Sequence, residues 1–244
     1  MTSTDDNHES SGTSASSPKP SPAQALVDQL AAAFAEQIRR AMGVEIEPLA
    51  QRDAQVALAY VDHYLGQLHE EDREPIVSLV AANAGAWFGE LIRREIGATW
   101  IGDGKDPRRL RLLIEPNFVH FSPVDLAYSA ILVGEPEEDP RLPTGAPLDA
   151  AFHLRKPPRG EGFVDPELDS AEASLSDHAW VMQRLAEVPP LPEDQYYSLT
   201  GRYETLLLIL ELLAARHSSL GMEPTRYHLN DYVAALTGSS SMGS

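Results

Sequence analysis

The sequence of 244 residues contains no cysteine. Without thiols the chain has no disulfides, no thiolate zinc ligands and no cysteine nucleophile, and a reducing compartment suits such a chain. Residues 1–11 carry acidic groups where a secretory leader needs basic ones, and no apolar stretch follows them. We therefore expect a cytoplasmic protein.

Long hydrophobic runs are missing as well. The leucine-rich run Leu206–Leu210 ends at Glu211, far short of the roughly 20 residues that a membrane-spanning helix requires. We expect the chain to have no membrane partner.

Basic residues are scarce, with 19 Lys and Arg against 37 Asp and Glu and a net charge of −18. This charge repels both nucleic-acid phosphates and anionic lipids, so we expect no nucleic-acid partner. Acidity of this kind keeps many bacterial proteins soluble, and that is its simplest interpretation. A partner attracted by charge would be a basic protein.

Composition shifts along the chain predict five parts. Residues 1–20 are polar, without hydrophobic periodicity, and are expected to be disordered. A helix should begin at Ser21, where a capping serine precedes Pro22 and Gln24 stands at the capping-box position. The expected parts are the tail 1–20, an α+β core 21–134, a proline-rich acidic surface excursion 135–169, C-terminal helices 170–237 packed on the core, and a flexible tail 238–244.

Apolar periodicity predicts two further helices in the core, at about 48–70 and 75–97. The second of them carries Gly85 and Gly89 inside it. Each glycine costs about 1 kcal/mol relative to alanine in a helix interior. We therefore expect another element to pack closely against this strip.

Three short β-branched or aromatic segments follow, at 98–101, 110–114 and 118–121, separated by turn residues. They predict a small antiparallel meander. A short helix should run through Ile131, and residues 151–156 form a possible edge strand within the excursion. The last third predicts helices at about 170–185, 192–217 and 226–236, with the leucine-rich middle helix the most buried of the fold. The fold class is thus α+β: three N-terminal helices, a small antiparallel β-meander and a helical C-terminal part.

Motifs for metal, cofactor or nucleophilic chemistry are not found. His63 and His69 lie six residues apart, which places them on opposite faces of a helix, unlike the i,i+4 pair of a helical zinc site. The loop 102–106 lacks the lysine-serine ending of a P-loop and is better explained as a hairpin turn. There is no Gly-x-Ser-x-Gly motif, and Asp177-His178 are neighbours that point in different directions on a helix. We expect no metal and no cofactor.

Polar residues near the glycine strip are the best candidates for a binding site. Glu90 and Arg94 have the i,i+4 spacing of a helix-surface ion pair. A basic island follows in this acidic chain, and we expect it to receive the acidic stretch 135–139 or an acidic partner, with the intramolecular pairing preferred. The island consists of Lys105, Arg108, Arg109 and Arg111. The candidate binding residues are Glu90, Arg94, Arg109, Arg111 and His120.

The stretch from Gly85 to Arg94, followed by Gly97 and Trp100, has the pattern G-x-x-x-G-E-x-x-R-R. It resembles bacterial domains of unknown function in which such a helix leads into a small sheet. The resemblance covers about fifty residues, from the glycine helix to Pro123. It implies a bacterial origin and an α+β core, and it brings no established activity with it.

Three functions are open at this stage. The preferred one is a non-catalytic interaction or regulatory protein that binds another protein through a helical face or the meander. The alternative is a small enzyme whose site is assembled around the glycine helix and the meander, from Glu90, Arg94, Arg111 and His120. A further alternative is an acidic immunity or antitoxin-like protein, whose charge would match a basic toxin.

Overall fold

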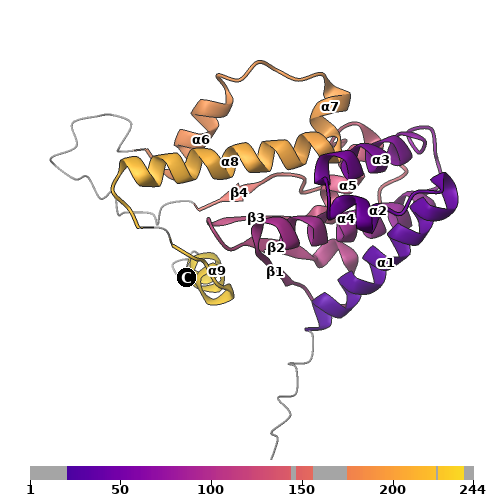
Figure 1. Ribbon diagram of the computed structural model, residues 1–244, viewed down its shortest axis with the longest axis horizontal. Coiled ribbons are helices and arrows are strands. Elements are labelled where there is room, and N and C mark those ends of the chain that lie inside the picture. The colour runs from indigo at the N-terminus through magenta and orange to yellow at the C-terminus, as the bar shows by residue number, and fades with distance from the viewer. Residues whose placement is uncertain (1–20, 144–146, 156–174, 224, 239–244) are drawn as a thin grey trace, which may run out of the picture.

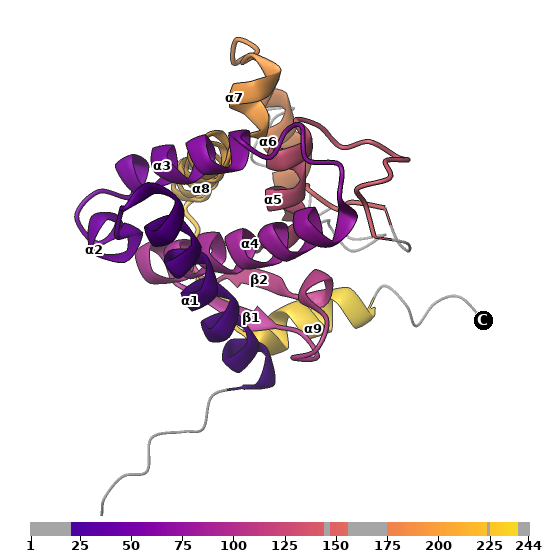
Figure 2. The same cartoon turned by 90° about the vertical axis from the view of Figure 1, so that its right-hand side faces the viewer.

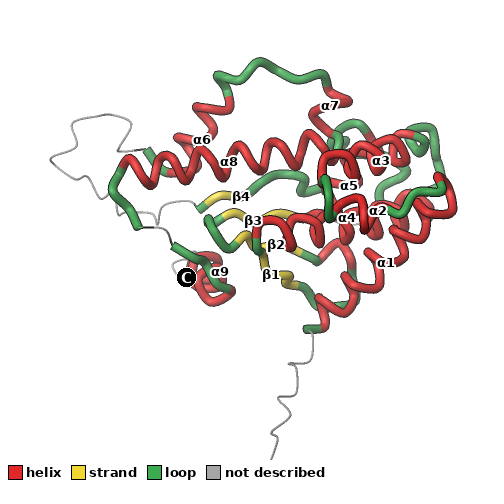
Figure 3. The backbone as a smooth tube through the Cα atoms, in the orientation of Figure 1, coloured by secondary structure: helices red, strands yellow, loops and turns green. Residues whose placement is uncertain are grey.

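The computed structural model describes residues 21–143, 147–155, 175–223 and 225–238. They form an α+β fold, as predicted, in which a small antiparallel sheet lies among helices (Figures 1 and 3). The helices are α1 (Pro22–Met42), α2 (Ile46–Ala50), α3 (Ala54–Gly66), α4 (Glu74–Ile96), α5 (Pro123–Leu132), α6 (Asp177–Leu185), α7 (Glu193–Tyr197), α8 (Leu199–Ser219) and α9 (Leu229–Gly238). The strands are β1 (Ala98–Ile101), β2 (Arg111–Ile114), β3 (Val119–Phe121) and β4 (His153–Leu154), and a short 3-10 helix, η1 (Pro107–Arg109), precedes β2.

Helix α1 begins and ends as its sequence predicts. The Ser21 side chain accepts a hydrogen bond from the Gln24 backbone N–H at 3.1 Å, and Pro22 occupies the first helical position. Gly43 ends the helix with φ of 70°, a left-handed conformation that glycine adopts without strain. The predicted first helix is confirmed.

The predicted helix at 48–70 is wrong in its continuity. The structure has two helices here, α2 and α3, separated by residues 51–53. The Asp53 side chain accepts a hydrogen bond from the Val56 N–H at 3.1 Å and so begins a new helix instead of continuing the old one. A local capping residue overrides the apolar periodicity of the whole segment.

Helix α4 is the core helix, and its glycine strip makes the predicted close contact. A methyl group at Gly85 would come within 2.5 Å of the Val124 Cα, because the start of α5 lies directly on this position. At Gly89 a methyl group would overlap the ring of Trp100 on β1. Most of α4 is buried between α1, α5 and the sheet (Figure 2). Among the described helices it alone is long and apolar enough to cross a membrane by length and composition, properties it shares with the core helices of folded domains.

The sheet has the order β1-β2-β3-β4, with every neighbouring pair antiparallel. The three predicted strands and the edge strand in 151–156 are confirmed. Side chains alternate between the two faces of a strand. Trp100, Leu112 and Phe121 are cross-strand partners and share the face toward α4, whereas Leu113 and His120 lie on the opposite face. Helix α9 covers that second face (Figure 2).

Tyr232 of α9 is the anchor of this cover. Its ring stacks on Phe118 with ring centroids 4.1 Å apart. Its buried hydroxyl lies 2.6 Å from the Ile114 carbonyl oxygen, to which it donates, and accepts the Val119 N–H at 2.9 Å. One side chain therefore bonds a carbonyl at the end of β2 and an N–H at the start of β3.

The C-terminal helices correct two predictions. The expected single helix at 192–217 is interrupted at Ser198, whose side chain accepts the Gly201 N–H at 2.9 Å and begins α8 directly after α7. The expectation that this helix is the most buried is also wrong. Only one side of α8 is buried, including Leu206, Ile209 and Leu213, because α8 lies in the outer layer beside α3 (Figures 1 and 2).

Parts of the predicted organisation lie outside the described residues. These are the tail 1–20, residues 144–146 and 156–169 of the excursion, residues 170–174 before α6, and residues 239–244. In the described part of the excursion, the Arg141 guanidinium pairs with Asp139 at 2.8 Å.

Candidate functional site

Glu90 lies where α4 meets β1, and its carboxylate is held from three sides. The Trp100 indole N–H donates to Glu90 Oε1 at 2.7 Å, and the Gln24 amide donates to the same oxygen at 3.1 Å. The Arg93 guanidinium contacts both carboxylate oxygens, at 2.8 and 3.0 Å. Burial acts to raise the pKa of Glu90, but these hydrogen bonds outweigh it and lower the pKa. The carboxylate is charged and its bonds tie α1, α4 and β1 together.

The predicted ion pair between Glu90 and Arg94 is wrong. Arg94 donates to the backbone carbonyl of Glu90 at 3.2 Å, and its guanidinium pairs with Glu47 of α2 at 2.7 Å. Arg93, three residues after Glu90, takes the carboxylate instead. The Arg93 side chain reaches the half-buried carboxylate oxygens of Glu90, whereas the Arg94 side chain extends toward α2.

The basic island pairs with acidic residues other than those expected. Arg109 is exposed and lies 3.4 Å from Asp103 and 3.5 Å from Asp106 in the turn between β1 and β2. Arg108 pairs with Asp125 and Arg111 with Asp149, at 3.2 and 3.5 Å. The preferred pairing with 135–139 is therefore wrong. In that stretch Glu135 pairs with Arg202 and Asp139 with Arg141.

Arg111 and His120 are brought together on the second face of the sheet. His120 stacks on His153 of β4, with ring centroids 4.9 Å apart, and His153 Nε2 lies 2.6 Å from Asp149 Oδ1. The other Asp149 oxygen faces Arg111. We call this group the histidine cluster, and it consists of Arg111, His120, Asp149 and His153.

Burial and the neighbouring charges tune this cluster. Burial lowers the pKa of His120 from 6.5 to about 4, aided by His153 and Arg111 and opposed by Asp149. The hydrogen bond from His153 lowers the pKa of Asp149, against the opposing effect of burial. His120 is therefore neutral and Asp149 charged at neutral pH.

Asp125 joins the histidine cluster to α5. Its carboxylate is 2% exposed, accepts from Arg108 Nε at 3.2 Å and accepts the Asp149 backbone N–H at 3.0 Å. Burial raises its pKa, although Arg108 and the backbone bond act against that rise. Asp125 thus fixes the backbone that carries Asp149.

The four residues of the enzyme alternative do not converge. Glu90 binds the Trp100 side chain on the face toward α4, and His120 lies on the other face, so the sheet separates them. Within the described ranges, no group of three His, Cys, Asp or Glu side chains is arranged to hold a metal ion. The cluster is a network of satisfied polar groups on a covered sheet face.

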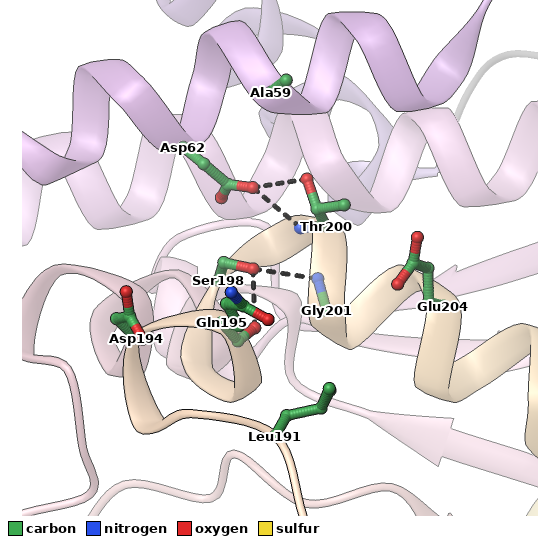
Figure 4. A pocket seen from close by; sticks show the side chains of 9 residues that line it. All are labelled: Ala59, Asp62, Leu191, Asp194, Gln195, Ser198, Thr200, Gly201 and Glu204. Carbon is green, nitrogen blue, oxygen red and sulfur yellow. Dashed lines mark hydrogen bonds between the residues drawn. The ribbon is translucent and has the colours of Figure 1, made fainter.

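Open cavities lie elsewhere, along the outer surface of α3. One, of about 390 Å³, is lined by Met42, Val56, Ala59, Tyr60 and His63. The other, of about 400 Å³, lies between α3, α7 and the start of α8 (Figure 4), and is lined by Ala59, Asp62, Leu191, Asp194, Gln195, Ser198, Thr200, Gly201 and Glu204. The two cavities adjoin at Ala59, which lines both, and we call them together the α3 groove.

Asp62 of α3 lines the cavity beside α7 and binds the backbone at the start of α8. Its carboxylate accepts the backbone N–H groups of Leu199 at 2.7 Å and Thr200 at 3.0 Å, and the Thr200 hydroxyl at 2.5 Å (Figure 4). Burial raises its pKa in spite of these bonds. Because Asp62 already occupies the positive end of α8, the groove offers no helix terminus to an anion.

Helix α3 has apolar side chains on its outer face as well as on the inner face that packs in the core. Its inner face buries Ala57, Leu58, Val61 and Leu65 in the core. The outward residues of the groove recur at i, i+3, i+4 and i+7, which places them in one stripe. These are Val56, Ala59, Tyr60 and His63. Val56 is 42% exposed and Tyr60 39%.

Sequence reasoning missed Asp125, Asp149 and His153 of the network and most of the groove. Ser122-Pro123-Val124-Asp125 was interpretable only as a helix start, which it is, since the Ser122 hydroxyl accepts the Asp125 N–H. Asp149 lies in a proline-rich segment without a periodic pattern. The outer stripe of α3 was detectable as Val56, Ala59, Tyr60 and His63 at helical spacing.

Comparisons with family models, with curated proteins and with solved structures give no match for this chain. The geometry of the described residues is therefore the basis for the functional proposal.

Proposed function

We propose that this chain is a non-catalytic interaction protein that binds another protein through the α3 groove. The observation that carries the proposal is the second apolar stripe of α3, which lines an open cavity and is not needed for the core. Single exposed apolar residues are ordinary on protein surfaces. Val56 and Tyr60 differ because they lie on one turn of one helix and face the same cavity.

The groove has the features of a protein-binding surface. Tyrosine is enriched at interfaces because its ring buries a large area while its hydroxyl stays hydrated. Apolar anchors at helical spacing beside a groove are typical of sites that accept an amphipathic segment. Leu191, which is 49% exposed, extends the apolar lining toward α7.

The proposed surface differs from the binding residues that the sequence predicted. Glu90, Arg94 and Arg109 each pair with a neighbour in the fold, and Arg111 and His120 belong to the histidine cluster. None of these five lines the α3 groove.

Affinity capture from the native host with three versions of the chain tests this function. We expect a protein that the wild type retains, and that the double variant Val56→Gln, Tyr60→Gln loses, because glutamine keeps the helix but removes the apolar contact. The matched control is Leu229→Gln on α9, a residue that is 42% exposed, lies far from α3 and should leave capture unchanged (Figure 1).

The retained protein must also bind the purified wild type directly, with an affinity that the double variant weakens. Equal capture by the wild type and the double variant would refute the proposed surface. Turnover of a captured small molecule by the purified chain would refute the non-catalytic function.

A further inference from the structure

Resting on the proposed function, we infer that the α3 groove receives a basic amphipathic helix of another protein. Its apolar side chains would contact Val56 and Tyr60, and its Lys or Arg side chains would contact Asp194 and Glu204. The apolar stripe alone does not determine the charge of the partner, which the acidic residues beside it indicate.

The charges of the groove all have one sign. Its acidic lining residues are Asp62, Asp194 and Glu204, and no Lys or Arg is among the described residues that line either cavity. Asp194 and Glu204 lie on opposite sides of the second cavity, with Leu191 along its lower edge (Figure 4). Two carboxylates in one cavity, next to the cavity that Val56 and Tyr60 line, match a helix that carries basic residues beside its apolar face.

These two carboxylates are available to a partner. Both residues are exposed, and in the part of the chain that the structure describes neither forms an ion pair. The Gln55 amide donates a long hydrogen bond to Glu204 Oε1, at 3.4 Å. By contrast, the oxygens of Asp62 already accept the backbone N–H groups of Leu199 and Thr200. Asp62 therefore adds negative charge to the groove, but its oxygens are already used in these bonds.

Helical shape and basic charge both follow from the groove. Its stripe consists of Val56, Ala59 and Tyr60 with His63 at one end, spans about two helical turns, and accommodates anchors at i, i+3 or i+4, and i+7 of a partner helix. A second copy of this chain does not fit, because each copy carries a net charge of −18 and would bring like charges together.

Two designed peptides of about 14 residues probe the inference with the full chain. Both carry Leu at i, i+3, i+4 and i+7; the remaining positions are Lys in one and Glu in the other. Binding is measured by fluorescence anisotropy of the labelled peptide. We expect the Leu/Lys peptide to bind at least tenfold more tightly than the Leu/Glu peptide at about 0.05 M NaCl, with the preference largely lost at about 0.5 M.

Two double variants that each remove two negative charges distinguish binding at the groove from attraction to the acidic chain as a whole. Asp194→Asn with Glu204→Gln should weaken the Leu/Lys peptide about tenfold at low salt. The matched control is Glu137→Gln with Glu138→Gln, two exposed acids outside the groove, which should change the affinity less than about twofold. The apolar pair Val56→Gln, Tyr60→Gln should weaken both peptides.

The outcomes separate the two proposals. If the apolar pair weakens both peptides while the Asp194 and Glu204 pair behaves like its control, the groove binds helices but the basic partner is wrong. If the apolar pair changes neither peptide, both the partner and the proposed function at this surface are wrong.

Discussion

The imidazole of His153 stacks on that of His120 with ring planes inclined by 19°, beside the guanidinium of Arg111 and the carboxylate of Asp149. This arrangement keeps His120 neutral in the folded protein. Protonation would place a cation on a half-buried ring that faces a second imidazole and an arginine, so acidification should destabilise this sheet face.

The first prediction concerns pH and stability. Because folding lowers the pKa of His120 from 6.5 to about 4, the unfolded chain binds the proton more tightly. The contribution of His120 is therefore fully present above pH 6.5 and is lost as the pH falls from 6.5 to about 4, by on the order of 2 kcal/mol. Urea unfolding at several pH values within this interval measures the loss. His120→Phe should flatten the profile there, and an unchanged slope would rule out His120 as its source.

The second prediction concerns the Tyr232 hydroxyl. Tyr232→Phe leaves the ring stacked on Phe118 but removes the donor to the Ile114 carbonyl and one of two acceptors of the Val119 N–H, the other being the Asn117 carbonyl at 2.8 Å. We expect a loss of about 1–3 kcal/mol in the free energy of unfolding, with faster amide exchange at Val119. Tyr227→Phe is the control, because no hydrogen bond of its hydroxyl is among those of the described residues, and it should stay within about 0.5 kcal/mol of the wild type.

The third prediction compares two glycines in helices. Gly85→Ala places a methyl group against the backbone of α5, which cannot move without displacing the whole helix, and should cost about 1–3 kcal/mol. Gly66→Ala, whose nearest neighbour would be the His69 ring at 3.8 Å, should be neutral or stabilise by up to about 1 kcal/mol. Thermal unfolding of the two variants tests this difference. Equal melting temperatures of Gly85→Ala and Gly66→Ala would contradict the close packing at Gly85.

The fourth prediction contrasts two polar residues of α4. Glu90→Ala leaves the buried Trp100 indole N–H without its acceptor and should cost about 1–3 kcal/mol. Arg94→Ala removes a surface ion pair with Glu47 and an exposed hydrogen bond to the Glu90 carbonyl, and should cost less than about 1 kcal/mol. Denaturant midpoints of the two variants test this order, and a reversed order would mean that the Glu90 network contributes little.

Much of the fold follows from local sequence. The caps at Ser21 and Ser122 and the three strands are each encoded within a few neighbouring residues, so periodicity and cap chemistry predict them. The glycine spacing of α4 predicts a close contact at Gly85 but does not say that α5 makes it. The break at Ser198 is also local, but the leucines that follow it dominate the pattern.

The site follows from the sequence far less. Arg111 and His120 are candidates as polar residues near the glycine strip, yet their partners Asp149 and His153 come from the segment beyond α5. Asp62 reaches Leu199 across 137 residues. Such contacts depend on how distant elements pack, and no single segment of the chain carries that information. The same limit explains why the exposed side of α8 was expected to be buried.

The contact between Tyr232 and Val119 also has a consequence for synthesis. The two residues lie 113 positions apart in the chain. At a translation rate of about 5–20 residues per second, roughly 6 to 23 s pass between the addition of Val119 and that of Tyr232. During this interval Leu113 and Phe118 of the nascent sheet lack their cover. The nascent chain therefore exposes an apolar sheet face that the finished protein covers.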